Sequence, residues 1–511
     1  MAQSNAVEMK GITKTFGRVN ANHDVDFVLK KGEILSVLGE NGSGKTTLMN
    51  ILSGVYFPDE GEIYVNGEEV SICSPKDALD LGIGMVHQHF KLVDVLSATE
   101  NIILGLEGKT RLNLKSVRET VVSLINSYGF ELDPDKKIYE MSVSEKQTVE
   151  IVKMLYRGAD ILILDEPTAV LTPQETNKLF EVLRNMRSDG KSIIIITHKL
   201  NEVMEISDRV TVLRKGEQVG EVMTAESSIE QLTELMVGEK VNLDIDRKDP
   251  VNPQKRLAIS HLTVNGPEGV KSVKDANFEV YSGEILGVAG IAGSGQKELL
   301  EAIAGLKKIS EGNISYFSPE GLEEDLTQMN PAQIQERKIC FSFVPEDRLG
   351  MGLVASMDLP ANMMVRLLKT DHAMFPDRKE PERMADEIIR QLDVSTPGLN
   401  VPIRQLSGGN VQKLLVGREI SMDPNVLMVA YPVRGLDIQS SYTIYHLLNE
   451  QKENGVAVIC IIEDLDVLLE LCDRIIVLCD GEIAGTLDAR NATKEQIGLL
   501  MTGQTEDQKD E

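Results

Sequence analysis

The sequence predicts an α/β protein built from two tandem copies of one domain, and three observations support this fold class. Short apolar runs alternate with helix-length amphipathic stretches, which indicates a mostly parallel sheet whose strands are buried on both faces. Two segments recur in the same order: DVDFVLKKGE (24–33) returns as DANFEVYSGE (275–284), and SDRVTVLRKGE (207–217) returns as CDRIIVLCDGE (472–482). Between the copies, the polar segment 238–256 contains two prolines.

These patterns assign elements and domain boundaries. The expected buried strands are 34–38, 161–164 and 193–196 in the first copy, and 285–289, 426–429 and 458–462 in the second. We expect a first domain over 1–240, a linker over 241–256, a second domain over 257–503 and a disordered tail over 504–511.

Composition narrows the class of protein. The chain has 511 residues, 42% hydrophobic and 26% charged, which is typical of globular proteins with sizeable cores. The formal charge of −27 repels nucleic-acid phosphates, so we expect no nucleic-acid partner. The N-terminus does not read as a signal peptide, and no long uncharged apolar window predicts a membrane span.

A phosphate-binding loop follows the strand at 34–38. Residues 39–46 read GENGSGKT and match the pattern GxxxxGK[ST]. Glycines let backbone N–H groups turn inward, and the next helix adds a positive N-terminus. Lys45 is expected to reach the β- and γ-phosphates, and Thr46 to hold Mg²⁺. The predicted ATP-binding residues are Gly39, Glu40, Asn41, Gly42, Ser43, Gly44, Lys45, Thr46 and Thr47.

Polar residues also close three other strands of the first copy. Asp165 and Glu166 follow the strand at 161–164, and we expect Asp165 to hold the Mg²⁺ shell and Glu166 to polarise the attacking water. His198 closes the strand at 193–196 and is a candidate γ-phosphate contact, although a strand-end histidine also suits a structural hydrogen bond. Gln88 follows another short strand and by itself reads as a surface residue.

The phosphate loop, Gln88, the strand-end Asp165-Glu166 and His198 resemble motifs of ABC-transporter ATPases. The signature of that family, LSGGQ, is close to LSGGN at 406–410. The resemblance implies two domains paired head to tail, each with a helical signature subdomain. It makes Gln88 a catalytic and Mg²⁺-binding residue and places Phe16 against adenine, although a single Phe equally suits a core. It also implies that one domain's signature binds ATP held by the other, through Ser407, Gly408, Gly409 and Asn410.

The two copies have lost complementary motifs. In the second copy, Gln296 and Lys297 replace Lys45 and Thr46, while the first copy has MSVSE (141–145) in place of the signature. Thr172 stands where the second copy keeps Asp437. Every intact motif thus belongs to one composite site. The degenerate site comprises Gly290, Gly293, Ser294, Gly295, Gln296, Lys297, Glu346, Ala430, Tyr431, Glu463 and Ser142.

Further motifs resemble the ATPase subunits of simple-sugar and nucleoside importers, namely 84–102, GQKE (295–298), VPEDR (344–348) and RGLD (434–437). Ala430-Tyr431 departs from the acid pair of sugar-type members and favours the nucleoside branch. The resemblance implies two membrane permease subunits docked near the Gln loops, the segments around Gln88 and its counterpart Glu346. It also implies an extracytoplasmic binding lipoprotein or periplasmic protein, and it places this chain on the cytoplasmic face of the membrane.

Three alternatives remain open at this point. The first is a monosaccharide importer ATPase. The second is a soluble tandem ABC protein acting on ribosomes or in DNA repair, which the short linker, the net charge and the degenerate site disfavour. The third is a nucleotide-binding scaffold without turnover.

Overall fold

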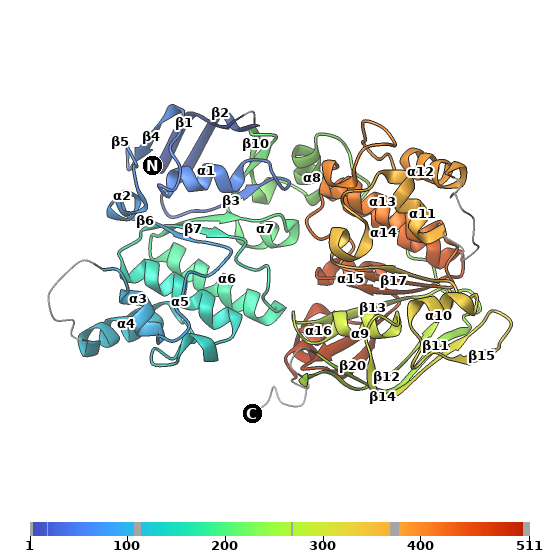
Figure 1. Ribbon diagram of the computed structural model, residues 1–511. Coiled ribbons are helices and arrows are strands. Elements are labelled where there is room, and N and C mark those ends of the chain that lie inside the picture. Colours follow the sequence, from blue (N-terminus) through green and yellow to red (C-terminus); the bar gives the residue numbers. More distant parts are fainter. Residues whose placement is uncertain (1–3, 18, 107–113, 267–268, 368–377, 504–511) are drawn as a thin grey trace. The chain divides into compact units, whose positions relative to one another are not determined.

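The computed structural model describes residues 4–17, 19–106, 114–266, 269–367 and 378–503 (Figure 1). The predicted tail at 504–511 lies outside these residues. The chain divides into two compact units, Met1–Val241 and Asn242–Glu511.

The first unit contains a six-stranded sheet in the order β10-β9-β3-β8-β7-β6, parallel except for the β9–β10 pair. A second, antiparallel sheet has the order β2-β1-β4-β5. The strands are β1 (Asn5–Phe16), β2 (Val19–Lys30), β3 (Ile34–Leu38), β4 (Glu60–Val65), β5 (Glu68–Val70), β6 (Ile83–Val86), β7 (Ile161–Asp165), β8 (Ser192–Ile196), β9 (Arg209–Arg214) and β10 (Glu217–Met223).

Three helices of the first unit begin at capping boxes. Ser97, Ser142 and Thr172 each form a capping box with a glutamate three residues later. The helices are α1 (Lys45–Leu52), α2 (Pro75–Asp80), α3 (Ala98–Ile103), α4 (Leu114–Tyr128), α5 (Val143–Tyr156), α6 (Pro173–Ser188), α7 (Leu200–Ile206) and α8 (Ile229–Val237).

The second unit repeats this plan. Its six-stranded sheet has the order β16-β17-β18-β13-β19-β20, with only β19–β20 antiparallel, and its antiparallel sheet has the order β12-β11-β14-β15. The strands are β11 (Lys255–Asn265), β12 (Lys271–Tyr281), β13 (Ile285–Gly290), β14 (Ile309–Phe317), β15 (Glu323–Asp325), β16 (Phe341–Val344), β17 (Val426–Ala430), β18 (Ala457–Ile461), β19 (Arg474–Cys479) and β20 (Glu482–Asp488).

The second unit's helices are α9 (Gln296–Ile303), α10 (Pro331–Glu336), α11 (Leu359–Leu367), α12 (Lys379–Gln391), α13 (Gly408–Ile420), α14 (Ile438–Glu453), α15 (Leu465–Leu471) and α16 (Lys494–Met501). A single π-helical turn, Arg348–Gly352, lies between β16 and α11. In the part of the chain that the structure describes, no helix combines the length and apolar character needed to cross a bilayer.

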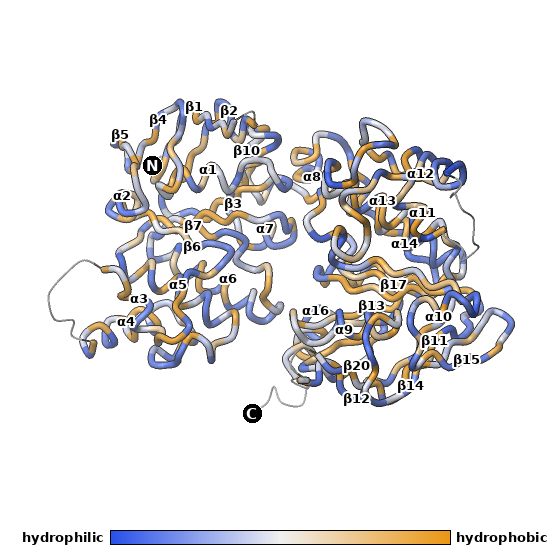
Figure 2. The backbone as a smooth tube through the Cα atoms, in the orientation of Figure 1, coloured by the Kyte–Doolittle hydropathy of each residue, from blue (hydrophilic) through white to orange (hydrophobic). Residues whose placement is uncertain are grey.

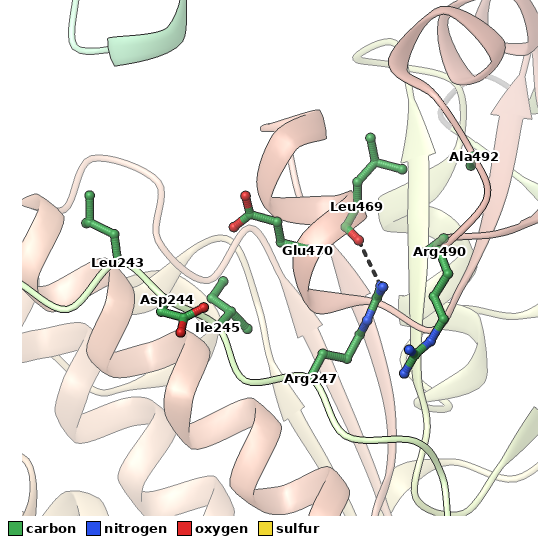
Figure 3. Close-up of a pocket in the computed structure, with 9 residues that line it drawn as sticks. Leu243, Asp244, Ile245, Arg247, Leu469, Glu470, Arg490 and Ala492 are labelled. Atoms are coloured by element: carbon green, nitrogen blue, oxygen red, sulfur yellow. Dashed lines mark hydrogen bonds between the residues drawn. The ribbon is translucent and has the colours of Figure 1, made fainter. Parts of the chain in front are cut away.

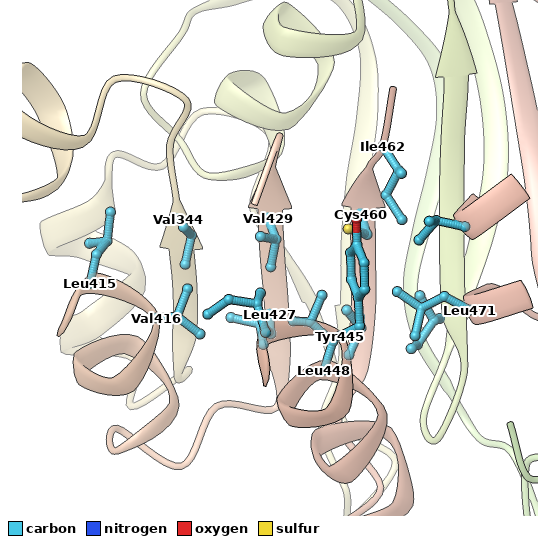
Figure 4. Packing of buried hydrophobic residues seen from close by; sticks show 14 of the residues in the cluster. Val344, Leu415, Val416, Leu427, Val429, Tyr445, Leu448, Cys460, Ile462 and Leu471 are labelled. Carbon is cyan, nitrogen blue, oxygen red and sulfur yellow. The ribbon is translucent and has the colours of Figure 1, made fainter. Parts of the chain in front are cut away.

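The parallel sheets are buried on both faces, as the continuous apolar runs predict. In β7, Ile161 and Ile163 belong to one core, whereas Leu162 and Leu164 belong to another. The hydropathy view shows the same concentration of apolar residues along the central strands (Figure 2). In the second unit, side chains of β16, β17 and β18 pack against α13, α14 and α15 (Figure 4). The α/β fold class is therefore confirmed.

Part of the segment predicted as a linker packs against the second unit. Ile245 is part of the core beneath α15, and Arg247 donates a hydrogen bond to the carbonyl of Leu469 at 2.8 Å (Figure 3). The segment lines one side of a hollow of about 600 Å³, with Glu470 and Arg490 on the other. This hollow lies where β19 begins, at the opposite edge of the sheet from the loop that follows β13.

An aspartate anchors the strand before the phosphate loop in each unit, with different burial. Asp473 accepts hydrogen bonds from the Ile285 amide (2.8 Å) and the Lys452 ammonium (2.7 Å), and both side chains are buried, at 9% and 1% exposure. Asp208 accepts from the Ile34 amide (2.9 Å) and Arg187 (2.6 Å), but these side chains are 35% and 39% exposed.

Lys452→Ala is expected to destabilise the second unit by about 3–5 kcal/mol, because it leaves a buried carboxylate unpaired. The matched change Arg187→Ala should cost at most about 1 kcal/mol, because water solvates the remaining charge. Hydrogen exchange of peptides from 285–290 and 34–38 in the full chain measures both effects. Equal protection losses in the two variants would contradict this account.

Candidate functional site

The predicted phosphate loop of the first unit lies between β3 and α1, which begins at Lys45. Gly44 has φ 100°, and a Cβ there would lie 2.3 Å from the carbonyl of Ala21, so only glycine fits. Ser43 is buried, and its hydroxyl has no hydrogen-bond partner among the residues that the structure describes. An unpaired buried hydroxyl inside such a loop suits a phosphate oxygen as its partner.

The Lys45 side chain folds back over this loop. Its ammonium donates to the carbonyls of Gly39 (2.7 Å) and Glu40 (2.9 Å). Burial lowers the pKa of Lys45, and the carboxylates of Glu166 and Asp165 oppose that shift. The loop thus holds a buried cation beside two acidic side chains, as phosphoryl-transfer chemistry requires.

Three side chains predicted from separate motifs meet at the carboxyl edge of the parallel sheet. Glu166 accepts a hydrogen bond from Gln88 Nε2 at 2.8 Å on one carboxylate oxygen, and its other oxygen lies 3.0 Å from His198 Nδ1. Gln88, Glu166 and His198 follow the ends of β6, β7 and β8, which are neighbours in the sheet. The structure therefore brings Gln88 into the cluster, although alone it reads as a surface residue.

Glu166 adopts a backbone conformation that is uncommon for its residue type. Its φ is 47°, and its amide donates to the carbonyl of Ile196 at 2.9 Å. The hydrogen bond with His198 is the main cause that lowers the pKa of Glu166, which keeps the side chain ionised. An ionised carboxylate held at this edge suits a general base.

Thr46, Gln88 and Asp165 are the predicted Mg²⁺ ligands. Asp165 is buried, and burial together with the neighbouring Glu166 charge raises its pKa to about 6, while Lys45 opposes the shift. A divalent cation compensates two adjacent carboxylates, so this environment fits Mg²⁺. Phosphates and water would supply the remaining ligands of a nucleotide-bound Mg²⁺. Within the described residues, no group of three or more His, Cys, Asp or Glu side chains is placed to hold a metal ion.

Phe16 ends β1 and is not a core residue. Its side chain is 43% exposed, its ring lies at 69° to that of Tyr56 with centroids 5.2 Å apart, and Lys14 Nζ lies 5.6 Å from its centroid. An exposed aromatic ring at the end of a strand suits the predicted adenine contact. The contact between Tyr56 and Phe16 could not be predicted from the sequence, because Tyr56 belongs to no motif.

The loop of the second unit keeps the shape of the first without its cation. It connects β13 to α9, and Gly295 has φ 98°, with a Cβ there falling 2.1 Å from the carbonyl of Ser272. Gln296 Nε2 donates to the carbonyl of Ile291 at 3.1 Å, which mirrors the bond of Lys45 to Glu40. Gln296 thus closes the loop as Lys45 does, but adds no charge.

Arg434 organises the strand ends of the second unit, and the sequence analysis missed its role. Its guanidinium forms an ion pair with Glu346 and another with Glu463 at 3.4 Å, and lies 5.8 Å from the centroid of the Tyr431 ring. Burial, with Glu463 and Glu346, raises the pKa of Tyr431 to about 12, so the phenol stays neutral. Ala430 is buried at the position of Asp165. The signal available in the sequence was two glutamates at the positions of Gln88 and His198.

The two predicted signature segments differ at their helix N-termini. In the first unit, Glu145 accepts from the Ser142 amide (2.8 Å) and from Lys136 (2.7 Å), so a carboxylate occupies the start of α5. In the second unit, Ser407 caps α13, and its hydroxyl accepts a hydrogen bond from Asn410 Nδ2 at 2.8 Å. No carboxylate takes part in this cap. Only the second segment therefore leaves its helix N-terminus suited to an external anion.

Asp437 and Thr172, which stand at matching positions of the two copies, are both helix N-caps. Asp437 accepts the Ser440 amide at 2.7 Å at the start of α14, and Thr172 accepts the Glu175 amide at 3.3 Å at the start of α6. Helix capping is sufficient to explain the local geometry of both side chains.

Comparison with known proteins agrees with this geometry. The ABC transporter family matches residues 22–169 and 273–432. The chain is 42% identical over 508 residues to the nucleoside import ATP-binding protein NupA of Lactococcus lactis subsp. cremoris, covering 98% of this chain and 99% of that protein. It is 41% identical to the guanosine import ATP-binding protein NupO of Bacillus subtilis, covering 98% of each.

A sugar-importer relative is also similar. The ribose import ATP-binding protein RbsA of Clostridium tetani is 38% identical, covering 96% of each chain. Both halves of this chain thus match the same family, and the relatives named here align with the chain over nearly their whole length. The chain therefore belongs to the ABC transporter family and carries two of its ATP-binding domains.

Proposed function

We propose that this chain is the ATP-hydrolysing subunit of a nucleoside importer, with hydrolysis confined to the site on the first unit. The observation that carries the proposal is the meeting of Gln88, Glu166 and His198 beside Lys45 in that unit. Lys45 would bind the β- and γ-phosphates, Thr46, Asp165 and Gln88 would hold Mg²⁺, and Glu166 would accept the proton of the attacking water.

The second unit would complete this site with its signature segment. Ser407, Gly408, Gly409 and Asn410 lie at an N-terminus that no carboxylate occupies, which supports a role in binding the γ-phosphate. In the first unit, the carboxylate of Glu145 occupies the equivalent start of α5. This charge supports the view that the first unit's signature segment does not bind a γ-phosphate.

Nucleosides are favoured over monosaccharides as the imported solute. The two nucleoside or guanosine import relatives share 42% and 41% identity with this chain, compared with 38% for the ribose relative. Ala430 and Tyr431 also depart from the acid pair of sugar-type members. A monosaccharide importer is the alternative.

Import would place this chain on the cytoplasmic face of the membrane and would require two membrane permease subunits and an extracytoplasmic binding lipoprotein or periplasmic protein. Exposed apolar side chains follow the Gln88 strand end, Val93 at 40% and Val95 at 71% exposure, and support a docking surface for a permease near the Gln loop.

Uptake into proteoliposomes tests the proposal. The full chain is combined with the permease pair encoded beside it and the cognate binding protein, and uptake of labelled guanosine, uridine and ribose is measured with internal Mg²⁺-ATP. We expect nucleoside uptake that fails with the Glu166→Gln chain. Ribose uptake alone would support the sugar alternative, and recovery of the chain with ribosomes instead of permeases would refute import.

A further inference from the structure

Arg348 lies where three segments of the second unit meet. Its side chain comes from the segment after β16, and Nη2 of its guanidinium donates a hydrogen bond to the carbonyl of Arg434, in the segment after β17. Its Nη1 lies 3.5 Å from the position that a Cβ on Gly408 would take, at the start of α13. One guanidinium thus borders both the signature segment (406–410) and the segment that leads to α14.

The turn that carries Arg348 is fixed against the helix that follows the signature segment. The π-helical turn Arg348–Gly352 closes with a hydrogen bond from the Leu353 amide to the Arg348 carbonyl at 2.7 Å. The Gly352 carbonyl accepts a hydrogen bond at 2.7 Å from Arg418, a buried residue of α13. A Cβ on Gly352 would lie 2.7 Å from Leu415 of the same helix, so the turn packs directly on α13. Such π turns are rare and often mark functional positions, and this one fixes the base of the Arg348 side chain.

The neighbouring signature glycine packs against a second fixed side chain. A Cβ on Gly409 would lie 3.3 Å from Ser440 Oγ and 3.5 Å from Asp437 Oδ2. Asp437 accepts hydrogen bonds from the Ser440 amide at 2.7 Å and from the Ser440 hydroxyl at 3.0 Å. The start of α13 is therefore bordered by Arg348 at Gly408 and by the cap of α14 at Gly409.

The carboxylates around Arg348 are engaged elsewhere. Glu346 and Glu463 both form ion pairs with Arg434, the second at 3.4 Å, and Asp347 accepts a hydrogen bond from a backbone amide of the π turn at 2.8 Å. Burial lowers the pKa of Arg348, and the neighbouring Arg434 charge lowers it further. Within the described part of the chain, a backbone carbonyl and packing therefore place this guanidinium, a task that suits a rigid fork of several donors better than an ammonium.

The first unit differs at both ends of this contact. Phe90 lies two residues beyond Gln88, as Arg348 lies two residues beyond Glu346. At the start of α5, the first unit carries the carboxylate of Glu145 in a capping box, and its segment 141–145 contains no glycine. The guanidinium therefore accompanies the signature segment that keeps its glycines, and an aromatic ring accompanies the one that has lost them.

We propose that Arg348 is a positioning residue for the signature segment of the second unit. Its turn is fixed on α13 and its guanidinium bonds the segment after β17, so the bridge holds residues 406–410 in the conformation that binds the γ-phosphate. This role rests on the proposed function and deepens it, because it names the side chain that orients the phosphate-binding segment.

The variants Arg348→Gln and Arg348→Lys test this role in the assembled transporter. A displacement of about 1 Å at a binding group can cost about 10²-fold in rate, so we expect both variants to lower the kcat of ATP hydrolysis at least about tenfold. Their ATP affinity, measured by titration, should stay within about twofold, because the first phosphate loop is intact. Lysine keeps the charge but lacks the fork, so wild-type turnover in Arg348→Lys would overturn the bridging role. Normal turnover in Arg348→Gln would overturn it as well.

Hydrogen exchange of the same full-length variants separates positioning from a general loss of structure. Peptides covering 406–416 should exchange at least about fivefold faster than in the wild type, whereas peptides covering β17 and β18 should stay within about twofold. Equal acceleration in β17 and β18 would leave Arg348 a purely structural role and would overturn the proposal.

Arg390→Gln on α12 is the matched control, because it removes the same charge from a side chain that is 78% exposed and 4.0 Å from Asp386. It should leave turnover and exchange within about twofold of the wild type. Glu166→Gln tests the hydrolytic site without altering Arg348. Normal hydrolysis by Glu166→Gln would refute the proposed function, whereas normal turnover in the Arg348 variants would refute only the positioning role.

Discussion

Glu166→Gln is expected to lower ATP hydrolysis at least a hundredfold while leaving ATP affinity within about threefold. A positioned general base contributes about 10²–10⁴-fold to a rate, and the amide cannot accept the proton of water. The substitution preserves size and hydrogen-bonding capacity beside Gln88 and His198, so the loop and its cation stay in place. Phosphate release by the assembled transporter measures the rate, and titration with ATP measures affinity.

Tyr431→Phe is the matched control for this change, because Tyr431 follows β17 as Glu166 follows β7 and has a similar φ of 50°. It should alter turnover by less than about threefold. Near-normal hydrolysis by the Glu166→Gln chain would remove Glu166 from its assigned role, and a hundredfold loss in Tyr431→Phe would place chemistry in the second unit.

Local patterns explain which parts of the fold were predictable. The strands of the parallel sheets are short continuous apolar runs, because helices or a second sheet cover both faces, and such runs are visible in sequence. The antiparallel sheets were not predicted. In β1, register shifts on both sides interrupt the alternation of buried and exposed residues, so the two-residue period is lost.

Long-range contacts explain what the sequence did not reveal. Arg434, Glu346 and Glu463 follow three different strands, and only the sheet order brings them together. The polar composition of 241–256 favours a linker, but the burial of Ile245 and the hydrogen bond from Arg247 to Leu469 depend on where the segment lies in the fold. The phosphate loop was predictable because its function depends on consecutive residues.

Lys45→Ala is expected to abolish most ATP turnover, by at least a hundredfold, because the buried ammonium is held over the first loop by the carbonyls of Gly39 and Glu40. Its loss removes the buried cation that faces Asp165, Glu166 and the phosphates. Gln296→Ala in the second loop removes a neutral amide bonded to the Ile291 carbonyl, so turnover should fall by no more than about threefold.

Phosphate release by these two variants, side by side in the assembled transporter, tests the central claim that the two units are unequal. The account predicts at least a thirtyfold lower rate for Lys45→Ala than for Gln296→Ala. Equal loss of turnover in the two variants would contradict it, because both phosphate loops would then serve hydrolysis alike.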